Sequence, residues 1–423
     1  MSNEIITSLD IGSSFVRAVI CERDANGSYK IIGTGTQPST GLRKGVVINI
    51  EATLRAVAAA IEMAEMSSGL EVTDCWTGIG GNHINGINSR GVVGISGKKK
   101  DNTEREIGQN DIDRVIDAAQ AVVIPTDRQI LEIIPQNFKV DDQKGIRNPI
   151  DMMGVRLESE VHIITCTLTG AQNLIKCVNR AGFRVNELIL QTLAAGRAVL
   201  TQEEMELGVV FLDLGGGTTD ALVYVEGTPY STYTVPAGGT QVTSDISIIK
   251  NISIENAEKI KIDAGCCWDT MMESDDTVIV PGVGGRPPMS IPRSQILAII
   301  KPRIEEIFKL VKQHLDTLNL GRPLGGGVVL TGGTAQLAGI VELANNVLKL
   351  PARLGYPIPT QELGGLVDEY RTPSYATVIG LALEGKRRLS LGQSERGSEL
   401  RQSDKKDLAL IAKLKSWLKE EFF

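Results

Sequence analysis

Apolar residues fall into short continuous runs that alternate with longer periodic stretches. Apolar runs at 5–9 and 209–212 predict buried strands. At 50–67 and 293–318 apolar residues recur every three or four positions, which predicts amphipathic helices. Pro302 lies inside the second of these helices and should kink or split it. The alternation of the two element types predicts an α/β protein.

The remaining elements follow the same patterns. Further strands are expected at 15–20, 30–36, 75–80, 129–134, 138–140, 161–167, 185–190, 221–225, 233–236 and 325–330, and further helices at 111–121, 171–181, 191–200, 253–263, 339–348 and 375–386, with one more beginning near Gln241. Residues 41–49 are expected to form a loop with two glycines. From about 85 to 164 the pattern changes to short β-rich pieces and one helix, which we interpret as an inserted small α/β module.

Two strands end in the same kind of turn. The strand at 209–212 is followed by Asp213 and a glycine- and threonine-rich tip, and the strand at 5–9 by Asp10 and a glycine- and serine-rich tip. Such tips suit phosphate, because glycine lets backbone N–H groups approach an anion and a strand-end carboxylate can hold a hydrated cation. One such hairpin is more often an ordinary turn. Two copies predict two related domains that face one nucleotide.

A third glycine motif follows the strand at 325–330. Here Thr331 is followed by Gly332, Gly333 and Thr334, and the next predicted helix begins at 339. The open backbone and the helix N-terminus offer a third surface for a nucleotide. Taken alone, this step is a common α/β turn.

Composition narrows the class of protein. A chain of 423 residues with 42% hydrophobic and 22% charged residues is expected to form more than one soluble domain. The net charge of −7 gives no reason to expect nucleic acid as a partner. Six scattered cysteines without C-x-x-C spacing indicate buried free thiols in a reducing compartment and no zinc site. Without a signal peptide or a bilayer-spanning run, the body is expected in the cytosol.

The C-terminal segment has a different character. Residues 389–406 are polar and predict a flexible linker. The pattern of residues 407–423 predicts an amphipathic helix whose apolar side would carry Leu410, Ile411, Leu414, Trp417, Leu418 and Phe422, with lysines beside it. A short helix of this kind on a tether is typical of a monotopic anchor on an anionic membrane surface. The alternative is a helix that docks on the body or on a partner.

The glycine motifs carry a resemblance to known proteins. Asp-Ile-Gly at 10–12, Asp-Leu-Gly-Gly-Gly-Thr-Thr-Asp at 213–220 and Thr-Gly-Gly-Thr at 331–334 resemble the superfamily of actin, sugar kinases and heat-shock chaperone ATPases. Within it, nearly the whole chain resembles the FtsA family of bacterial cell-division proteins. The 85–164 module, the terminal helix and stretches such as Ile134-Pro-Gln and Ser416-Trp-Leu-Lys-Glu-Glu-Phe make that resemblance specific.

The resemblance implies an actin-like two-domain ATPase fold with an inserted small α/β subdomain in the first domain. The implied divisions are 1–84 (first domain core), 85–164 (inserted subdomain), 165–197 (first domain continued), 198–240 (second domain core), 241–307 (upper subdomain), 308–388 (second domain continued and final helix), 389–406 (linker) and 407–423 (membrane helix). It also implies ATP with Mg²⁺, self-association into filaments, and tethering of the division protein FtsZ to the inner face of the cytoplasmic membrane at the division site, where later divisome proteins are recruited.

The resemblance also assigns roles to residues. Those expected to hold the nucleotide are Gly12, Ser13, Ser14, Gly215, Gly216, Gly217, Thr218, Gly238, Gly239, Glu258, Lys261, Gly332, Gly333 and Thr334. Asp10 and Asp213 are expected to act on Mg²⁺ through water. Gln191 is placed to orient the attacking water, but a neutral amide is a weak base, so hydrolysis should be slow. The alternative for Gln191 is a packing role at the domain junction.

Partner binding is expected on the upper subdomain. By the resemblance, the partly acidic C-terminal tail of FtsZ binds there, and Arg293, Lys301 and Arg303 are candidates to receive it. Surface solubility explains these three cations nearly as well.

A small-molecule kinase of the same superfamily is the alternative function. Such an enzyme needs a carboxylate base beside a substrate hydroxyl, and the sequence offers none that is set apart from the metal pair. A chaperone would need a peptide-binding domain after residue 388, where only the linker and the short helix follow.

Overall fold

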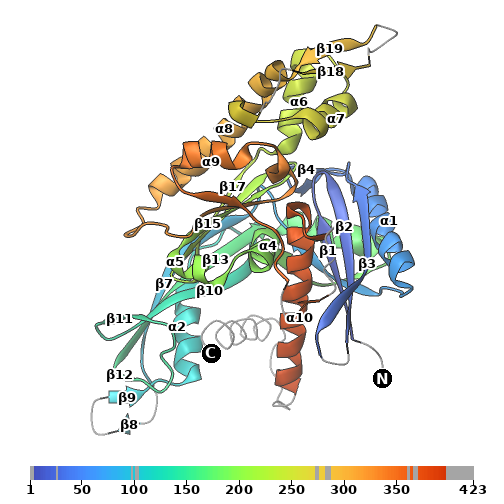
Figure 1. The fold of residues 1–423 in the computed structure, drawn as a ribbon. Helices are drawn as coiled ribbons and strands as arrows, with labels where there is room; N and C mark the ends of the chain where they lie inside the picture. The colour runs from blue at the N-terminus through green and yellow to red at the C-terminus, as the bar shows by residue number, and fades with distance from the viewer. Residues whose placement is uncertain are drawn as a thin grey trace.

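The structure is a computed structural model that describes residues 4–24, 27–96, 99–100, 104–271, 276–281, 287–359, 363–364 and 370–396. Two sheets, an inserted subdomain and an upper subdomain make up the fold (Figure 1). The predicted membrane helix at 407–423 and the linker residues 397–406 lie outside the described residues.

The first sheet has six strands in the order β14-β6-β1-β2-β3-β22. They are β1 (Ile5–Ile11), β2 (Phe15–Arg23), β3 (Tyr29–Pro38), β6 (Asp74–Ile79), β14 (Arg184–Leu190) and β22 (Leu363–Gly364). Successive side chains of a strand point to opposite faces. In β2, Val16 and Ala18 therefore join one core, whereas Val19 and Cys21 join another. Both faces of this sheet are buried.

The second sheet repeats this arrangement with five strands in the order β17-β16-β15-β20-β21. They are β15 (Val209–Leu214), β16 (Thr219–Val225), β17 (Thr228–Val235), β20 (Gly327–Thr331) and β21 (Ala352–Leu354). β15 pairs antiparallel with β16 and parallel with β20, as β1 pairs with β2 and β6. The duplication predicted from the two hairpins is therefore present in both sheets.

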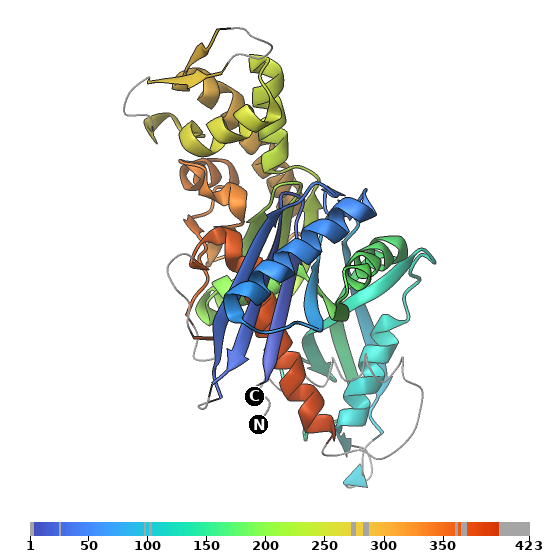
Figure 2. The ribbon, with the colours of Figure 1, turned by 90° about the vertical axis from the view of Figure 1, so that its right-hand side faces the viewer.

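Most helices fall close to their predicted places, but α5 was not predicted and α10 extends beyond its predicted end. The helices are α1 (Ile50–Ser68), α2 (Gln109–Gln120), α3 (Leu168–Arg180), α4 (Gln191–Val199), α5 (Gln202–Leu207), α6 (Gly239–Lys250), α7 (Ile254–Ala264), α8 (Arg293–Thr317), α9 (Ile340–Leu348) and α10 (Ala376–Arg396). A short hairpin of β4 (Leu42–Arg43) and β5 (Val46–Val47) precedes α1, which lies across the first sheet in Figure 2. No helix in the described part of the chain combines the length and apolarity needed to cross a membrane.

The two sheets share one apolar core around α4 and α10, which pack against each other. Figure 1 shows α10 running down the middle of the molecule. A Cβ at Gly380 of α10 would lie 1.8 Å from the carbonyl oxygen of Ala194 in α4, so the crossing requires glycine. Val19 of the first sheet and Phe211 of the second both belong to this shared core.

The predicted inserted module forms a separate four-stranded antiparallel sheet in the order β11-β10-β13-β7, with α2 packed on it. Its strands are β7 (Asn85–Gly94), β10 (Arg128–Val140), β11 (Gln143–Ile146) and β13 (Arg156–Thr167), and a smaller sheet contains β8 (Lys99–Lys100), β9 (Glu104–Glu106) and β12 (Met153–Gly154). It occupies the opposite end of the molecule from the upper subdomain (Figure 1).

Two strands of this subdomain correct the sequence prediction. The pieces expected at 129–134 and 138–140 are one strand, β10, whose pairing with β13 shifts register next to Glu132 and next to Asn137. Such irregularities interrupt the alternation of apolar and polar residues, which explains the missed continuity. β13 begins at Arg156, before the expected residue 161, and ends at Thr167 as expected.

The upper subdomain contains α6, α7 and α8, with the strands β18 (Thr277–Val280) and β19 (Met289–Pro292). Pro302 does not split α8, which continues through it. Proline removes the N–H that would bond to the carbonyl of Ala298. Ala298 and Pro302 are both exposed, so water can replace the missing donor.

The final helix also departs from the prediction. It was placed with the second domain, but α10 packs on β1 and β6 of the first sheet, and β22 also joins that sheet. The helix continues to Arg396, so residues 389–396 are helical although they were assigned to the linker. Leu389 packs against the shared core, which ties this extension to the body.

All six cysteines are buried free thiols, as their spacing predicted. Burial raises the pKa of Cys21 and Cys267 to about 12. Both thiols therefore stay protonated and unreactive at neutral pH.

Candidate functional site

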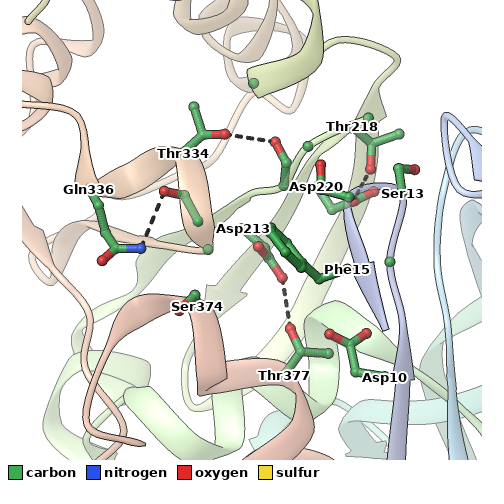
Figure 3. A pocket seen from close by; sticks show the side chains of 18 of the residues that line it. Asp10, Ser13, Phe15, Asp213, Thr218, Asp220, Thr334, Gln336, Ser374 and Thr377 are labelled. Carbon is green, nitrogen blue, oxygen red and sulfur yellow. Dashed lines mark hydrogen bonds between the residues drawn. The ribbon is translucent and has the colours of Figure 1, made fainter. Parts of the chain in front are cut away.

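A cavity of about 480 Å³ opens between the two sheets, where the ends of β1 and β15 face each other. Side chains from both halves of the molecule converge on it in Figure 3. Its lining includes Asp10, Gly12, Ser13, Ser14, Phe15, Arg17, Gly45, Gln191, Asp213, Gly215, Gly216, Gly217, Thr218, Asp220, Gly239, Glu258, Lys261, Gly332, Gly333, Thr334, Gln336, Ser374 and Thr377. The cavity is therefore built by both copies of the repeated hairpin.

The two hairpin turns have the same hydrogen-bond pattern. The N–H of Gly12 donates to the carbonyl of Phe15 at 3.0 Å, and the N–H of Gly215 donates to that of Thr218 at 2.9 Å. The turns also touch each other, since a Cβ at Gly216 would lie 2.0 Å from the Ser14 hydroxyl oxygen. Side chains at these glycines would close the gap in which backbone N–H groups can meet an anion.

Two aspartates, Asp10 buried and Asp213 partly buried, stand at the base of the turns. Burial is the largest influence on both and raises the pKa of Asp10 to about 6 and that of Asp213 to about 7. The difference follows from their cross-strand partners, because Asp10 pairs with Arg17 and Asp213 with Asp220. Arg17 lowers the pKa of Asp10, whereas the Asp220 carboxylate raises that of Asp213.

Neutral donors contact both carboxylates. The Thr377 hydroxyl of α10 donates to Asp213 at 3.1 Å (Figure 3). The side-chain amide of Gln191 donates to Asp10 at 2.7 Å. Gly80 is the residue after β6, and a Cβ there would lie 2.1 Å from the Gln191 amide oxygen. Glycine at this position therefore leaves room for the Gln191 side chain.

The upper side of the cavity is formed by α6 and α7. Lys261 is buried, and its Nζ lies 2.6 Å from Glu258 Oε2 and 3.2 Å from the carbonyl of Gly239. Glu258 and Lys261 are three residues apart on α7 and therefore share a face, as expected. The Thr334 hydroxyl donates to the Gly215 carbonyl at 2.9 Å and so connects the third glycine motif to the second turn.

The third glycine motif differs from the expected strand-to-helix step. Gly332 has a φ of 88°, and a Cβ there would lie 2.3 Å from Asp213 Oδ1, so only glycine fits. A short 3₁₀ helix, Gly333–Gln336, follows it, and α9 begins at Ile340. The N-terminus of α9 is therefore separated from Gly332, and the backbone of the 3₁₀ turn lines the cavity instead.

Of the predicted nucleotide and metal residues, only Gly238 is missing from the cavity lining. Its N–H donates to the Gln241 side chain at 2.8 Å. Sequence reasoning missed Phe15, Arg17, Gly45, Asp220, Gln336, Ser374 and Thr377. Arg17 and Asp220 could have been found, because each lies directly across the hairpin from a predicted aspartate.

These residues suit a magnesium-bound nucleotide. The glycine-rich turns and the hydroxyls of Ser13 and Thr218 could donate to phosphate oxygens. Asp10 and Asp213 are oxygen donors whose ionised forms a cation would stabilise. No group of three or more His, Cys, Asp or Glu side chains in the described ranges has metal-holding geometry. A cation here would take most of its ligands from water and phosphate, as Mg²⁺ commonly does.

The three cations proposed for partner binding already have contacts within the chain. Lys301 pairs with Asp269 and lies 5.2 Å from the centre of the Trp268 ring. Arg303 pairs with Asp245 at 2.7 Å, and Arg293 donates to the Ala264 carbonyl at 3.4 Å. An acidic peptide would have to compete with these contacts.

Comparison with family profiles finds two matches in the chain. Residues 210–380 match the profile described as "Cell division protein FtsA", and residues 81–165 match "SHS2 domain inserted in FTSA". The second match spans nearly the same residues as the inserted module predicted at 85–164.

Solved structures of low sequence identity share the fold. The PilM–PilN type IV pilus biogenesis complex has a chain with a TM-score of 0.63 at 15% identity, covering 90% of this chain and 98% of that one. MreB5 of Spiroplasma citri bound to ADP gives 0.52 at 13% identity, covering 94% and 99%. The fold is therefore actin-like with an inserted subdomain, as predicted.

Curated relatives align over their full length. The chain is 42% identical over 425 residues to the cell division protein FtsA of Borreliella burgdorferi, covering 100% of both chains. It is 40% identical over 423 residues to that of Pseudomonas aeruginosa, covering 100% of this chain and 99% of the relative. For Escherichia coli K12 the identity is 36%, covering 99% and 98%. With its actin-like sheets and its SHS2 insertion, the chain belongs to the FtsA family of cell division proteins.

Proposed function

We propose that this cell-division protein binds ATP with Mg²⁺, assembles into filaments, and tethers FtsZ to the inner face of the cytoplasmic membrane at the division site. There it helps to recruit later divisome proteins. The observation that carries the nucleotide part is the cavity itself, where the paired glycine turns and one aspartate from each sheet converge. Membership of the FtsA family supports the cell-division part.

In the proposed complex the chain's own residues have separate roles. The two turns hold phosphate oxygens through backbone N–H groups, while Asp10 and Asp213 orient water on the cation. Mg²⁺ would neutralise phosphate charge. Glu258 and Lys261 flank the adenosine, opposite the third glycine motif. Gln191 can orient a water molecule but cannot take its proton, so we expect slow hydrolysis.

A soluble kinase receives less support. The cavity lining contains four carboxylates in the described part of the chain, Asp10, Asp213, Asp220 and Glu258. Asp10 and Asp213 are the proposed cation pair, Glu258 contacts Lys261 and Thr243, and Asp220 accepts hydrogen bonds from Thr218 at 2.7 Å and Thr234 at 2.6 Å. None of the four is therefore set apart to act as a general base beside a substrate hydroxyl.

The proposals of membrane binding and of FtsZ binding rest on the sequence pattern and on membership of the FtsA family. The amphipathic pattern at 407–423 supports a peripheral anchor on anionic lipid. Arg293, Lys301 and Arg303 lie on or beside the first turns of α8 and are our candidates for the acidic FtsZ tail. An FtsZ tail peptide should bind the full chain less tightly when Arg303 is replaced by alanine.

Co-sedimentation with anionic liposomes tests the adaptor function. The full chain, with and without ATP and Mg²⁺, is compared with a chain that ends at Arg396. That end point keeps α10 whole, whereas a cut at Leu389 would remove residues that are helical in the structure. We expect the full chain to pellet with liposomes and the shorter chain to stay in solution.

Two point variants distinguish the contribution of the apolar face to membrane binding from the effect of one added negative charge. Trp417→Glu places a charge on the apolar side of the predicted helix, and Ser416→Glu places the same charge about 100° further round. Pelleting should fall much more for Trp417→Glu. Equal pelleting of the full and shortened chains would reject the membrane anchor, and we would then return to the soluble enzyme.

A further inference from the structure

The short hairpin before α1 reaches the phosphate end of the cavity. Lys44 and Gly45 join β4 to β5 with φ values of 53° and 76°. Two positive φ values in a two-residue loop are the pattern of a type I′ turn. Gly45 lines the cavity, although the segment 41–49 was expected to be only a loop.

The hairpin tip contacts both phosphate turns. The N–H of Gly45 donates to the Ser13 hydroxyl at 3.1 Å. A Cβ at Gly217 would lie 3.0 Å from the backbone nitrogen of Lys44 and 2.5 Å from the Ser13 hydroxyl oxygen. The hairpin tip, the first turn and the second turn therefore meet at one point beside the cavity.

On its other side the same tip contacts the start of the inserted subdomain. The N–H of Asn82 donates to the carbonyl of Lys44 at 3.2 Å. A Cβ at Gly45 would lie 2.4 Å from Gly81 Cα, and one at Gly81 would lie 2.7 Å from Gly45 Cα. Gly81 is the first residue of the SHS2 match. Here backbone lies directly against backbone, with no side chain between them.

We infer that the Lys44–Gly45 turn is a positioning element that links the phosphates of the bound nucleotide to the inserted subdomain. The inference rests on the proposed nucleotide site. A terminal phosphate between the turns engages Ser13 and so changes the hydrogen bond from Gly45. Close backbone contacts have no rotamers to absorb such a shift. The displacement therefore passes to Gly81 and Asn82, and from there to β7.

Hydrogen exchange of single amides tests this link in the full chain. We compare Gly45 and Asn82 without nucleotide, with ADP and Mg²⁺, and with a non-hydrolysable ATP analogue and Mg²⁺. Because exchange reports local opening, both amides should exchange severalfold more slowly with the ATP analogue than with ADP.

Two serine variants provide a control. Ser13→Ala removes the acceptor for Gly45, whereas Ser39→Ala removes a buried hydroxyl that does not line the cavity and has no hydrogen-bond partner among the described residues. At saturating nucleotide, Ser13→Ala should abolish the difference between the two nucleotides at Asn82, and Ser39→Ala should keep it. Loss of the difference in both variants would overturn the inference.

Hydrogen exchange of the wild-type chain with ADP and with the ATP analogue also tests the inference without any variant. Binding of a fluorescent ATP analogue is measured first. If the chain does not bind it, the proposed nucleotide function fails. If it binds but Asn82 exchanges equally with ADP and the ATP analogue, the link to the inserted subdomain is wrong, while the nucleotide site stands.

Discussion

The two aspartates of the cavity lie at equivalent positions of a repeated hairpin, yet their surroundings differ. Arg17 stands across the hairpin from Asp10, and Asp220 stands across from Asp213. Neutralisation by a cation or a proton is therefore more favourable at Asp213 than at Asp10, because the pKa of Asp213 is raised further, to about 7, mainly by burial. The second copy of the hairpin is thus the one in which negative charge is less compensated by the protein.

Asp213→Asn should separate stability from nucleotide binding. Because burial raises the pKa of Asp213 from 3.8 to about 7, its contribution to stability is full below pH 3.8 and is lost as pH rises through 7. The neutral amide avoids this loss. At pH 8 without nucleotide we expect the free energy of unfolding to rise by about 2–4 kcal/mol.

Thermal unfolding with and without ATP and Mg²⁺ checks this prediction. The stabilisation by ATP and Mg²⁺ should shrink in the variant, because a carboxylate that orients cation-bound water is lost. Asp142→Asn, at a fully exposed side chain, is the control and should change neither quantity. A variant less stable than the wild type at pH 8 would contradict the expected sign.

His162 should make stability depend on pH. It is buried between the inserted subdomain and β17, with Nδ1 2.6 Å from Asn88 Oδ1 and Nε2 2.8 Å from the Thr232 hydroxyl. Burial lowers its pKa from 6.5 to about 4. Its contribution is therefore full above pH 6.5 and is lost as pH falls towards 4, by about 2 kcal/mol between pH 7 and pH 5.

Urea unfolding at pH 7 and pH 5 measures that dependence. In His162→Gln the position no longer titrates, so the loss of stability between the two pH values should be smaller than in the wild type. The pKa values of His83 and His314 are also lowered, mainly by burial, and supply the remaining slope. An unchanged difference in the variant would show that His162 binds no more protons in the unfolded chain than in the folded one.

At the scale of elements, regular patterns were predictable and irregular ones were not. α1 begins where Asn49 accepts a hydrogen bond from the N–H of Ala52 and ends at Gly69 with a φ of 71°, close to the expected 50–67. The short 3₁₀ turn after Gly332 and the bulged strand β10 were missed. Neither keeps one period for long enough to be recognised.

α10 is joined to the inserted subdomain by a buried ion pair. Arg388 pairs with Glu132 of β10 at 3.1 Å and with Glu187 of β14 at 2.6 Å. Burial alone would raise the pKa of Glu384, but Arg387, Arg197 and Arg388 together lower it to about 2. Glu384 is therefore ionised and fully paired inside the protein.

Glu384→Gln should be strongly destabilising. It removes the buried carboxylate that Arg387, Arg197 and Arg388 share, and breaking a buried ion pair in this way costs about 3–5 kcal/mol. The control is Glu305→Gln, since Glu305 pairs with Lys309 at the surface and such pairs contribute up to about 1 kcal/mol. Midpoints of urea unfolding give both values, and similar midpoints for the two variants would argue against a role of the cluster in stability.

Gly380→Ala should lower stability although alanine usually favours a helix by about 1 kcal/mol. The new Cβ would lie 1.8 Å from the Ala194 carbonyl, so α4 and α10 must separate. Since α4 also carries Gln191, ATP affinity should fall too. Gly321→Ala, with no neighbour within 4 Å of the new Cβ, is the control for the unfolding temperature. A variant as stable as the wild type would mean that the crossing is looser than described.

For the molecule as a whole, the sequence indicated two related halves with an insertion, because Asp10 and Asp213 begin matching turns. It did not indicate that the final helix returns to the first sheet. That assignment depends on contacts between residues far apart in the chain, such as the Thr36 and Tyr375 hydroxyls at 3.2 Å. Periodicity describes one element at a time and carries no information on such partners.

The shared core should make α10 necessary for folding. A chain that ends at residue 359 lacks α10 and exposes one face of the first sheet, whereas a chain that ends at Arg396 retains it. We expect the shorter chain to be insoluble, or to unfold without a cooperative transition, and the longer one to unfold cooperatively. Circular dichroism during heating distinguishes the two, and a cooperative shorter chain would contradict the shared core.

The core shared by the two sheets also affects the order in which the protein can fold during its synthesis. β14 completes the five main strands of the first sheet at Leu190, but α10, which covers one of its faces, ends only at Arg396. At about 5–20 residues per second, the intervening stretch takes a ribosome roughly 10–40 s. During that time an apolar sheet face waits for a helix that does not yet exist. We therefore expect this face of the nascent chain to be open to chaperone binding until residue 396 has left the ribosome.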